Sequence, residues 1–244
     1  MRGPLGNAEN FLVLTLDAQA EGQMPDRALL LRAQVNVRRV SSLVSNLLQA
    51  ACIEAGQVHF QMASVQLNEV VTDVLNLEGG AAALKTITLK REIDPHLPAV
   101  PLDHLQVSRI VTNLVNNAIK FTDADGTVEV RTGYDAESVH VAVRDSGPGM
   151  TEAQRRELFA PYRRVQLHGY TPGTGLGLYI AKRLTEAQGG AIRVESAVGG
   201  GSTFVVSFPR VAHAEASGRV VVPTDEPSAD VETRVTLSPR PRAA

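Results

Sequence analysis

The hydrophobic positions of the chain divide it into three regions. Residues 27–54 are predicted to form one long helix, because apolar side chains recur there at spacings of three and four. These positions are Val40, Leu43, Val44, Leu47, Ala51 and Cys52. We expect a shorter helix at 5–20 and a turn at 21–26, so residues 1–56 are predicted to form a helical hairpin. A narrow apolar stripe on a long helix indicates a bundle completed by a second copy of the chain.

The second region, about 57–210, alternates predicted strands and helices. Alternation of apolar and polar residues predicts strands at 58–62, 87–93, 127–133, 138–144, 191–196 and 203–208. Helical periodicity predicts helices at 68–84, 102–121 and 176–188. Helices grouped beside a mixed sheet predict an α+β fold, a two-layer sandwich. The third region, 211–244, is rich in Pro, Ala, Ser and charged residues and is predicted to be a disordered tail.

Composition narrows the possible functions. The net charge of −2 argues against a general binder of nucleic acid or membrane surfaces, which needs a basic excess. No apolar run approaches the roughly 20 residues that span a bilayer, so we expect no membrane segment. The single cysteine, Cys52, fits a reducing cytoplasm and is expected to be buried in the predicted hairpin.

Polar side chains follow one flank of the predicted helix 102–121. Asn113, Asn117 and Lys120 share a face of that helix, and a set of apolar residues points about a quarter turn away. The apolar set is Val107, Val111, Leu114 and Ala118. Carboxamide oxygens are neutral, hard ligands suited to Mg²⁺, and a lysine ammonium can meet phosphate charge. A solvated helix face with two incidental asparagines explains the same pattern.

A carboxylate followed by two glycines ends the predicted strand 138–144. In Asp145-Ser-Gly147-Pro-Gly149 the glycines allow the backbone to approach a flat ligand, and the carboxylate can accept a hydrogen bond from an exocyclic amine. The same residues also make an ordinary turn.

A second glycine run opens the predicted helix 176–188. Gly173, Gly175 and Gly177 would leave backbone N–H groups free to hold phosphate at the helix N-terminus. The spacing fits neither the dinucleotide-binding G-x-G-x-x-G fingerprint nor a P-loop. A flexible hinge is the alternative interpretation.

Taken in order, these motifs resemble the ATP-binding domain shared by histidine kinases, Hsp90 chaperones, type II topoisomerases and MutL proteins. The similarity to histidine kinases is closest: residues 113–121 resemble their N box, 145–149 the first glycine box and 173–178 the second. Residues 158–162, which contain Phe159, resemble the F box. Residues 189–196 and 201–204 resemble the closing strand pair, and the whole match covers about 57–210.

The resemblance implies a role for each matching residue. Asp145 would bind the adenine amino group, Asn117 would hold Mg²⁺, and Asn113 and Lys120 would reach the phosphates. Residues 150–172 would form a mobile lid over ATP, from which Arg164 would help to neutralise the triphosphate. The other three arginines of that loop are expected to be solvated surface: Arg155, Arg156 and Arg163. The remaining ATP-binding residues that the resemblance implies are Phe121, Gly147, Gly149, Gly173, Thr174, Gly175, Leu176, Gly177, Leu178 and Thr203.

The N-terminal region resembles the hairpin through which histidine kinases dimerise and on which they carry the phospho-acceptor. Residues 39–48 and 53–56 match its second helix. The family's first helix contains a box reading His-Glu-Leu-Arg-x-Pro-Leu, and Arg2-Gly-Pro-Leu5 matches the back half of that box. The acceptor histidine would then fall just before residue 1. At about 1.5 Å per residue the helix 5–20 is about 24 Å long and the helix 27–54 about 42 Å, which also indicates a shortened first helix. The alternative is that Pro4 simply opens the helix.

We therefore predict the catalytic core of a two-component sensor histidine kinase, with a hairpin (1–56), an ATP-binding domain (57–210) and a tail (211–244). It would bind ATP and Mg²⁺ and transfer the γ-phosphoryl group to a histidine, mainly by positioning and charge neutralisation. Without the acceptor histidine it is not expected to autophosphorylate in cis, although it would still phosphorylate a partner in a mixed dimer. The implied partners are a response regulator receiver domain and a second copy of the chain, in the cytoplasm or on the cytoplasmic side of a membrane-bound sensor. The alternatives are a degenerate module that binds nucleotide or docks a regulator, and an ATPase of the same fold.

Overall fold

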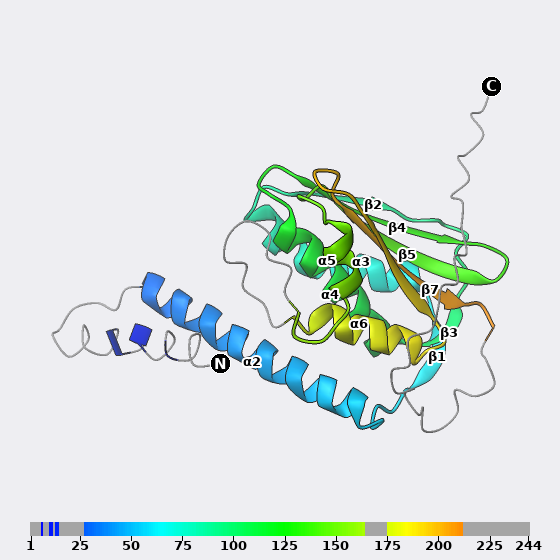
Figure 1. Cartoon of the computed structure of the whole chain (residues 1–244), viewed down its shortest axis with the longest axis horizontal. Helices are drawn as coiled ribbons and strands as arrows, with labels where there is room; N and C mark the ends of the chain where they lie inside the picture. Colours follow the sequence, from blue (N-terminus) through cyan, green and yellow to red (C-terminus); the bar gives the residue numbers. More distant parts are fainter. Residues whose placement is uncertain (1–5, 7–9, 12, 15–26, 164–174, 212–244) are drawn as a thin grey trace.

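The computed structural model describes residues 6, 10–11, 13–14, 27–163 and 175–211 (Figure 1). The predicted turn at 21–26, most of the predicted helix at 5–20, part of the predicted lid and nearly all of the predicted tail lie outside the described residues. Arg164, Gly173 and Thr174 lie outside them too.

The described elements run from a long helix into an alternation of strands and helices. Helix α2 (Arg27–Glu54) has the bounds that its apolar periodicity predicts. The helices after it are α3 (Leu67–Ala83), α4 (His104–Phe121), α5 (Glu152–Glu157) and α6 (Gly177–Glu186). The strands are β1 (Met62–Val65), β2 (Thr88–Glu92), β3 (Val100–Asp103), β4 (Thr127–Tyr134), β5 (Ser138–Asp145), β6 (Ala191–Ser196) and β7 (Ser202–Pro209).

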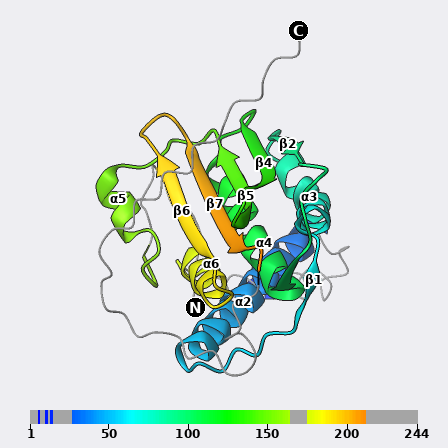
Figure 2. The same cartoon turned by 90° about the vertical axis from the view of Figure 1, so that its right-hand side faces the viewer.

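The main sheet has five strands in the order β2-β4-β5-β7-β6. Strands β2 and β4 are parallel and the other neighbours are antiparallel, so the sheet is mixed. Helices α3, α4 and α6 lie against one face of this sheet (Figure 2). This is the predicted α+β sandwich, and its core lies between the two layers. The apolar face of α4 is buried there as predicted: Val107, Val111, Leu114 and Ala118.

Two predicted boundaries were wrong because the sequence pattern did not reveal strand β3, which pairs with β1 and directly precedes α4. The strand predicted at 58–62 lies at Met62–Val65 instead, because it pairs with β3, a strand that local periodicity did not reveal. The helix predicted from residue 102 begins at His104, since Asp103 caps it: Asp103 Oδ1 accepts a hydrogen bond from Gln106 N at 3.0 Å. The other oxygen, Oδ2, accepts one from Gln61 N at 2.7 Å and so ties the segment before β1 to the start of α4.

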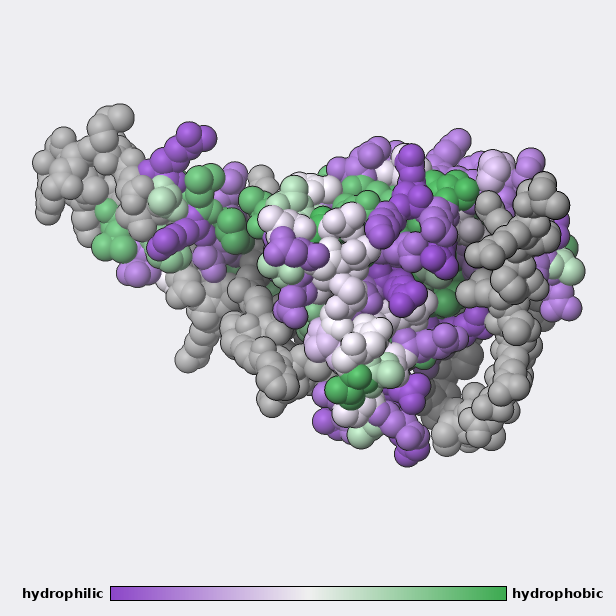
Figure 3. Space-filling model, turned by 90° about the horizontal axis from the view of Figure 1, so that it is seen from above, coloured by the Kyte–Doolittle hydropathy of each residue, from purple (hydrophilic) through white to green (hydrophobic). Residues whose placement is uncertain are grey.

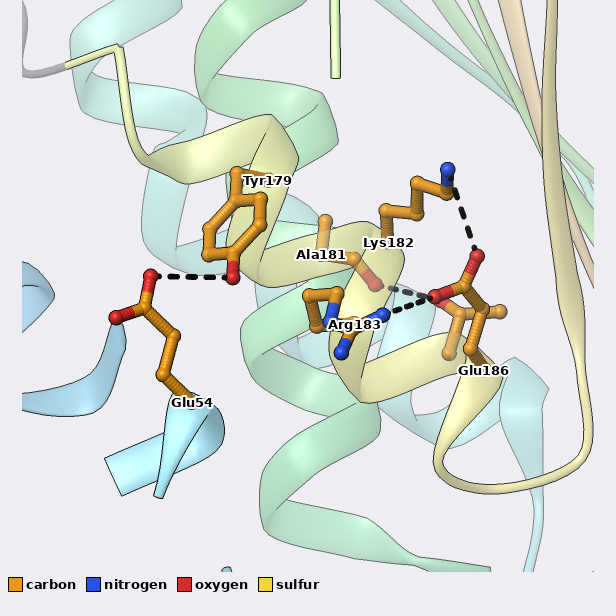
Figure 4. A network of polar contacts seen from close by, with 7 residues as sticks. Glu54, Tyr179, Ala181, Lys182, Arg183 and Glu186 are labelled. Carbon is orange, nitrogen blue, oxygen red and sulfur yellow. Dashed lines mark hydrogen bonds and ion pairs between the residues drawn. The ribbon is translucent and has the colours of Figure 1, made fainter. Parts of the chain in front are cut away.

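The C-terminal end of α2 packs against α6. Ala50 and Ile53 of α2 are buried, and the Tyr179 hydroxyl of α6 donates to Glu54 Oε1 at 3.4 Å (Figure 4). Along α6 itself, Glu186 pairs with Lys182 at 3.6 Å and with Arg183 at 3.3 Å. The long helix is therefore joined to the sandwich through one of its faces.

The prediction that Cys52 is buried was wrong. Cys52 is exposed, because α6 covers the side of α2 that carries Ala50 and Ile53 and not the side that carries Cys52. Other large apolar side chains of α2 are exposed as well, including Leu30, Leu31, Val35 and Leu48. Leu30, Leu31 and Val35 belong to the N-terminal half of α2, whereas Leu48 lies close to the packed end. In the space-filling view, hydrophobic and hydrophilic residues are interspersed over the surface (Figure 3). The predicted dimer through this helix stays a prediction.

None of the helices in the described part of the chain has the length and apolar character needed to cross a membrane.

Candidate functional site

Asp145 occupies the last position of β5 and is buried. The register of β5 and β7 places it opposite Ser202. Its Oδ1 accepts hydrogen bonds from Gly147 N at 2.9 Å and from Ser202 N at 3.2 Å. Burial raises the pKa of the Asp145 carboxyl, and the hydrogen bonds from Gly147 and Ser202 oppose that rise. The strand end thus holds one carboxyl group in a buried position.

Each of the two glycines after Asp145 stands where a side chain would not fit, for a different steric reason. A β-carbon at Gly147 would lie 2.7 Å from the carbonyl oxygen of Phe121, so this turn lies directly against the end of α4. Gly149 has φ +66°, and a β-carbon there would lie 1.9 Å from the Ala197 carbonyl oxygen. Any side chain would therefore displace the turn from its position between α4 and the loop after β6.

Helix α4 carries the predicted polar flank. Asn113, Asn117 and Lys120 are each half-buried, while the neighbouring apolar face is buried in the core. The Lys120 ammonium lies 4.6 Å from the centroid of the Phe121 ring. The sequence predicted this division of the helix into a buried face and a polar flank, and the fold confirms it.

The start of α6 meets the same helix one turn further back. A β-carbon at Gly177 would lie 3.0 Å from Asn113 Oδ1, so the first residue of α6 lies in contact with the Asn113 carboxamide. The preceding residue, Leu176, is buried, and Leu178 is half-buried against the core. The N-terminus of α6 therefore sits beside the polar flank of α4, where its backbone dipole favours negative charge.

The F-box segment contacts the second glycine run. A β-carbon at Gly175 would lie 2.5 Å from the Arg163 carbonyl oxygen, so the two segments touch although residues 164–174 separate them in the sequence. Phe159 is half-buried against the core, with Lys182 Nζ 5.9 Å from its ring centroid. Two of the loop arginines form exposed ion pairs, Arg156 with Glu152 and Arg163 with Glu157, in line with the predicted solvated surface.

One predicted residue is not brought to this site, and its neighbour is. In β7, Thr203 lies opposite Arg144, on the face of the sheet away from Asp145. Ser202, one residue earlier, is the residue that faces Asp145, whereas the ATP-binding role of Thr203 stays a prediction. The residues of β7 on the side of Ser202 are all buried: Ser202, Phe204, Val206 and Phe208.

Ser196 is a second residue that the sequence did not indicate. Its hydroxyl lies 3.0 Å from the Ser202 hydroxyl, accepts a hydrogen bond from Met150 N at 2.9 Å and donates to Gly201 O at 2.8 Å. A chain of hydroxyl groups therefore connects the strand pair beside Asp145 to the first residue after the glycine turn.

Comparison with known proteins assigns this arrangement to a family. Residues 102–212 match the family described as histidine kinase-, DNA gyrase B-, and HSP90-like ATPase. The virulence sensor protein BvgS of Bordetella bronchiseptica is 34% identical over 230 residues, which are 91% of this chain and 18% of BvgS. The sensor histidine kinase TmoS of Ectopseudomonas mendocina is 34% identical over 180 residues, 72% of this chain and 18% of TmoS. The chain thus spans about a fifth of the length of these two relatives.

A solved structure shares the fold. Full-length ShkA in complex with AMPPNP is 28% identical, with a TM-score of 0.67 over 78% of this chain and 39% of ShkA. The two-layer fold, the order of the motifs and the relatives all point to the same type of ATP-binding domain. The chain therefore contains an ATP-binding core of the histidine kinase type, and its residues 102–212 belong to the histidine kinase-, DNA gyrase B- and HSP90-like ATPase family.

Proposed function

We propose that the chain binds Mg·ATP along α4, with adenine at Asp145 and the phosphates between Asn113, Lys120 and the start of α6. The observation that carries this proposal is the meeting of three separate motifs on one helix. Gly147 abuts Phe121 at one end of the polar flank, and Gly177 abuts Asn113 at the other. The similarity to ShkA, which was solved with the ATP analogue AMPPNP, supports it.

The surroundings of Asp145 suit an exocyclic amine. Both backbone N–H groups that reach the carboxylate donate to Oδ1, which leaves Oδ2 with no backbone donor among the described residues. A hydrogen bond to a buried carboxylate is stronger than one in water, because the local dielectric is low. Oδ2 would therefore accept the adenine amino group.

The carboxamides of α4 fit Mg²⁺. Neither Asn113 nor Asn117 uses its side chain in a hydrogen bond to the described residues, and both are half-buried beside the start of α6. Neutral oxygen ligands suit a cation that keeps most of its waters and is shared with phosphate. We assign Asn117 to Mg²⁺ and Asn113 to the phosphates. When bound, the ion would neutralise phosphate charge.

The activity that follows is transfer of the γ-phosphoryl group to a histidine. The residues of this chain would bind and orient the nucleotide and neutralise its charge, which is most of what phosphoryl transfer requires of a protein. Lys120 and the N-terminus of α6 supply positive potential at the phosphates. We further propose that α2 belongs to a hairpin (1–56) that dimerises, that residues 57–210 form the catalytic domain, and that a response regulator receives the phosphoryl group.

Complementation between two chains tests this function. One chain is the protein as given; the other carries His-Glu directly before Met1, which places a histidine at the acceptor position of the family's box, and also carries Asn117→Ala, which disables its own nucleotide site. With γ-labelled ATP and Mg²⁺, we expect acid-labile label on the longer chain only when the shorter chain is present.

Two outcomes would contradict the proposed activity. Binding of ATP without label on the longer chain would indicate a module that only binds nucleotide. ATP hydrolysis without any phosphoprotein would indicate an ATPase of the same fold.

A further inference from the structure

Lys85 forms an unusual contact with the end of α4. It lies in the turn that joins α3 to β2, and its side chain is half-buried. The Lys85 ammonium donates three hydrogen bonds to backbone carbonyls: to Ile119 O at 2.9 Å, to Lys120 O at 3.0 Å and to Thr122 O at 2.9 Å. All three donors of the ammonium are thus directed at one turn of backbone.

The carbonyls that Lys85 holds are those that a helix leaves without partners. The last turn of an α-helix has no N–H groups beyond it to accept hydrogen bonds from, and its end carries partial negative charge. An ammonium that donates to several of these carbonyls fixes the backbone at that point. Lys85 therefore holds the last turn of α4 in one position.

The same turn forms one wall of the proposed nucleotide site. Between the carbonyls of Lys120 and Thr122 lies that of Phe121, which faces the Gly147 turn: a β-carbon at Gly147 would lie 2.7 Å from Phe121 O. One turn further back on α4 stands Asn117. Lys85 thus binds the backbone at the end of α4, and the same stretch of backbone contacts the Asp145–Gly149 turn through Phe121.

The turn that carries Lys85 has anchors of its own. Asp125 N donates to Thr86 Oγ1 at 3.1 Å, and Thr88 N donates to Gly126 O at 2.9 Å. These contacts join the turn to the loop between α4 and β4 without the Lys85 side chain. Removing the ammonium should therefore free the end of α4 and leave the turn itself in place.

We propose that Lys85 is a positioning residue for the nucleotide site: it sets the distance between the C-terminal end of α4, with Lys120 and, one turn earlier, Asn117, and the adenine-binding turn at Asp145. The inference rests on the proposed binding of Mg·ATP. Asp145 is held by the sheet and by Gly147 N and Ser202 N, which do not depend on Lys85. Loss of Lys85 should therefore affect the phosphate and metal part of the site more than the adenine part.

The test compares Mg·ATP with adenosine as ligands of the full chain. For Lys85→Met we expect the dissociation constant of Mg·ATP to rise about tenfold or more, and that of adenosine to change less than about threefold. Lys85→Arg, which keeps several donors, should recover most of the Mg·ATP affinity. Lys85→Gln should fall between the two and serves if the methionine variant folds poorly. Lys90→Met, which removes an exposed lysine of β2, is the matched control and should bind both ligands like the unaltered chain.

Equal losses for the two ligands, or a lower melting temperature with an unchanged ratio of the two affinities, would show that Lys85 only stabilises the fold and would overturn the inference. If the unaltered chain bound no Mg·ATP at all, the proposed function would fail, and the role of Lys85 with it.

Discussion

Ser202 stands opposite Asp145 across β7 and β5, and its backbone N–H donates to Asp145 Oδ1 at 3.2 Å. This pairing fixes a buried carboxyl group at the end of a strand, with its pKa raised by burial. A group so placed lowers stability when it ionises, and such a placement is expected where a carboxylate serves a ligand.

Asp145→Asn should separate binding from stability. The amide oxygen can still accept from Gly147 N and Ser202 N, but the amide nitrogen presents a donor where adenine needs an acceptor. We expect ATP affinity to fall below detection by calorimetry while the free energy of unfolding stays equal or rises. Since the folded pKa lies above the ordinary value of 3.8, the stability that the protonated form provides is complete below 3.8 and is lost as pH rises through the folded pKa. The gain in the variant should therefore appear at neutral pH and vanish in acid, and a variant that bound ATP normally would disprove the adenine assignment.

Gly177→Ala should weaken phosphate binding without unfolding the protein. The new β-carbon would lie 3.0 Å from Asn113 Oδ1, so either the carboxamide or the start of α6 must move. Alanine is the better helix former, which keeps the free energy of unfolding equal or higher. We expect the Mg·ATP dissociation constant to rise about threefold to tenfold, measured by titration calorimetry. Unchanged affinity would mean that this contact has no part in binding.

Gly80→Ala should stabilise the chain. Gly80 lies within α3, and a β-carbon there would meet no heavy atom within 4 Å. The substitution should add about 0.5–1 kcal/mol to the free energy of unfolding in urea, because glycine loses more backbone entropy in a helix than alanine. Gly126→Ala is the contrasting control: its β-carbon would lie 2.3 Å from Thr122 Cγ2 and should destabilise the fold. A loss of stability in the Gly80 variant would contradict the placement of this helix.

His140 should make stability depend on pH. It lies opposite Gly133 on β4, and its imidazole Nε2 is 2.6 Å from where a Gly133 β-carbon would stand. Burial lowers the pKa of His140 and the charge of Arg193 lowers it further, whereas Asp135 and Asp94 oppose the shift. The contribution of neutral His140 to the free energy of unfolding is therefore fully present above the ordinary pKa of 6.5 and is lost as pH falls through the lower pKa of the folded state. In urea unfolding, the free energy of unfolding of His140→Gln should fall less between about pH 7.5 and about pH 5 than that of the unaltered chain. An identical fall would show that His140 is not the source of the pH dependence.

Local patterns were sufficient for helices with a strong apolar face. The bounds of α2 and the buried face of α4 follow from side-chain spacing alone, because residues three and four apart in a helix form one apolar face that packs against its neighbours. The closeness of Asp145, Gly147 and Gly149 also follows from spacing, since a short motif places them within one turn.

Contacts between segments that are distant in the sequence could not be predicted from local patterns. The strand at Met62–Val65 depends on its pairing with β3, and the choice of Ser202 over Thr203 depends on the register of β5 and β7. Lys85 looks in the sequence like any solvated lysine after a helix. Its role emerges only when the fold brings the end of α4 beside it.

The most direct measurement of the central claim is the binding of ATP in the presence and absence of Mg²⁺, for the unaltered chain and for Asn117→Ala. We predict that Mg²⁺ strengthens ATP binding to the unaltered chain by about tenfold or more, and that this gain disappears in the variant. Asn116→Ala is the control, since Asn116 is exposed and donates to Glu78 at 3.2 Å, away from the polar flank. An equal gain from Mg²⁺ in all three proteins, or no ATP binding by the unaltered chain, would contradict the account.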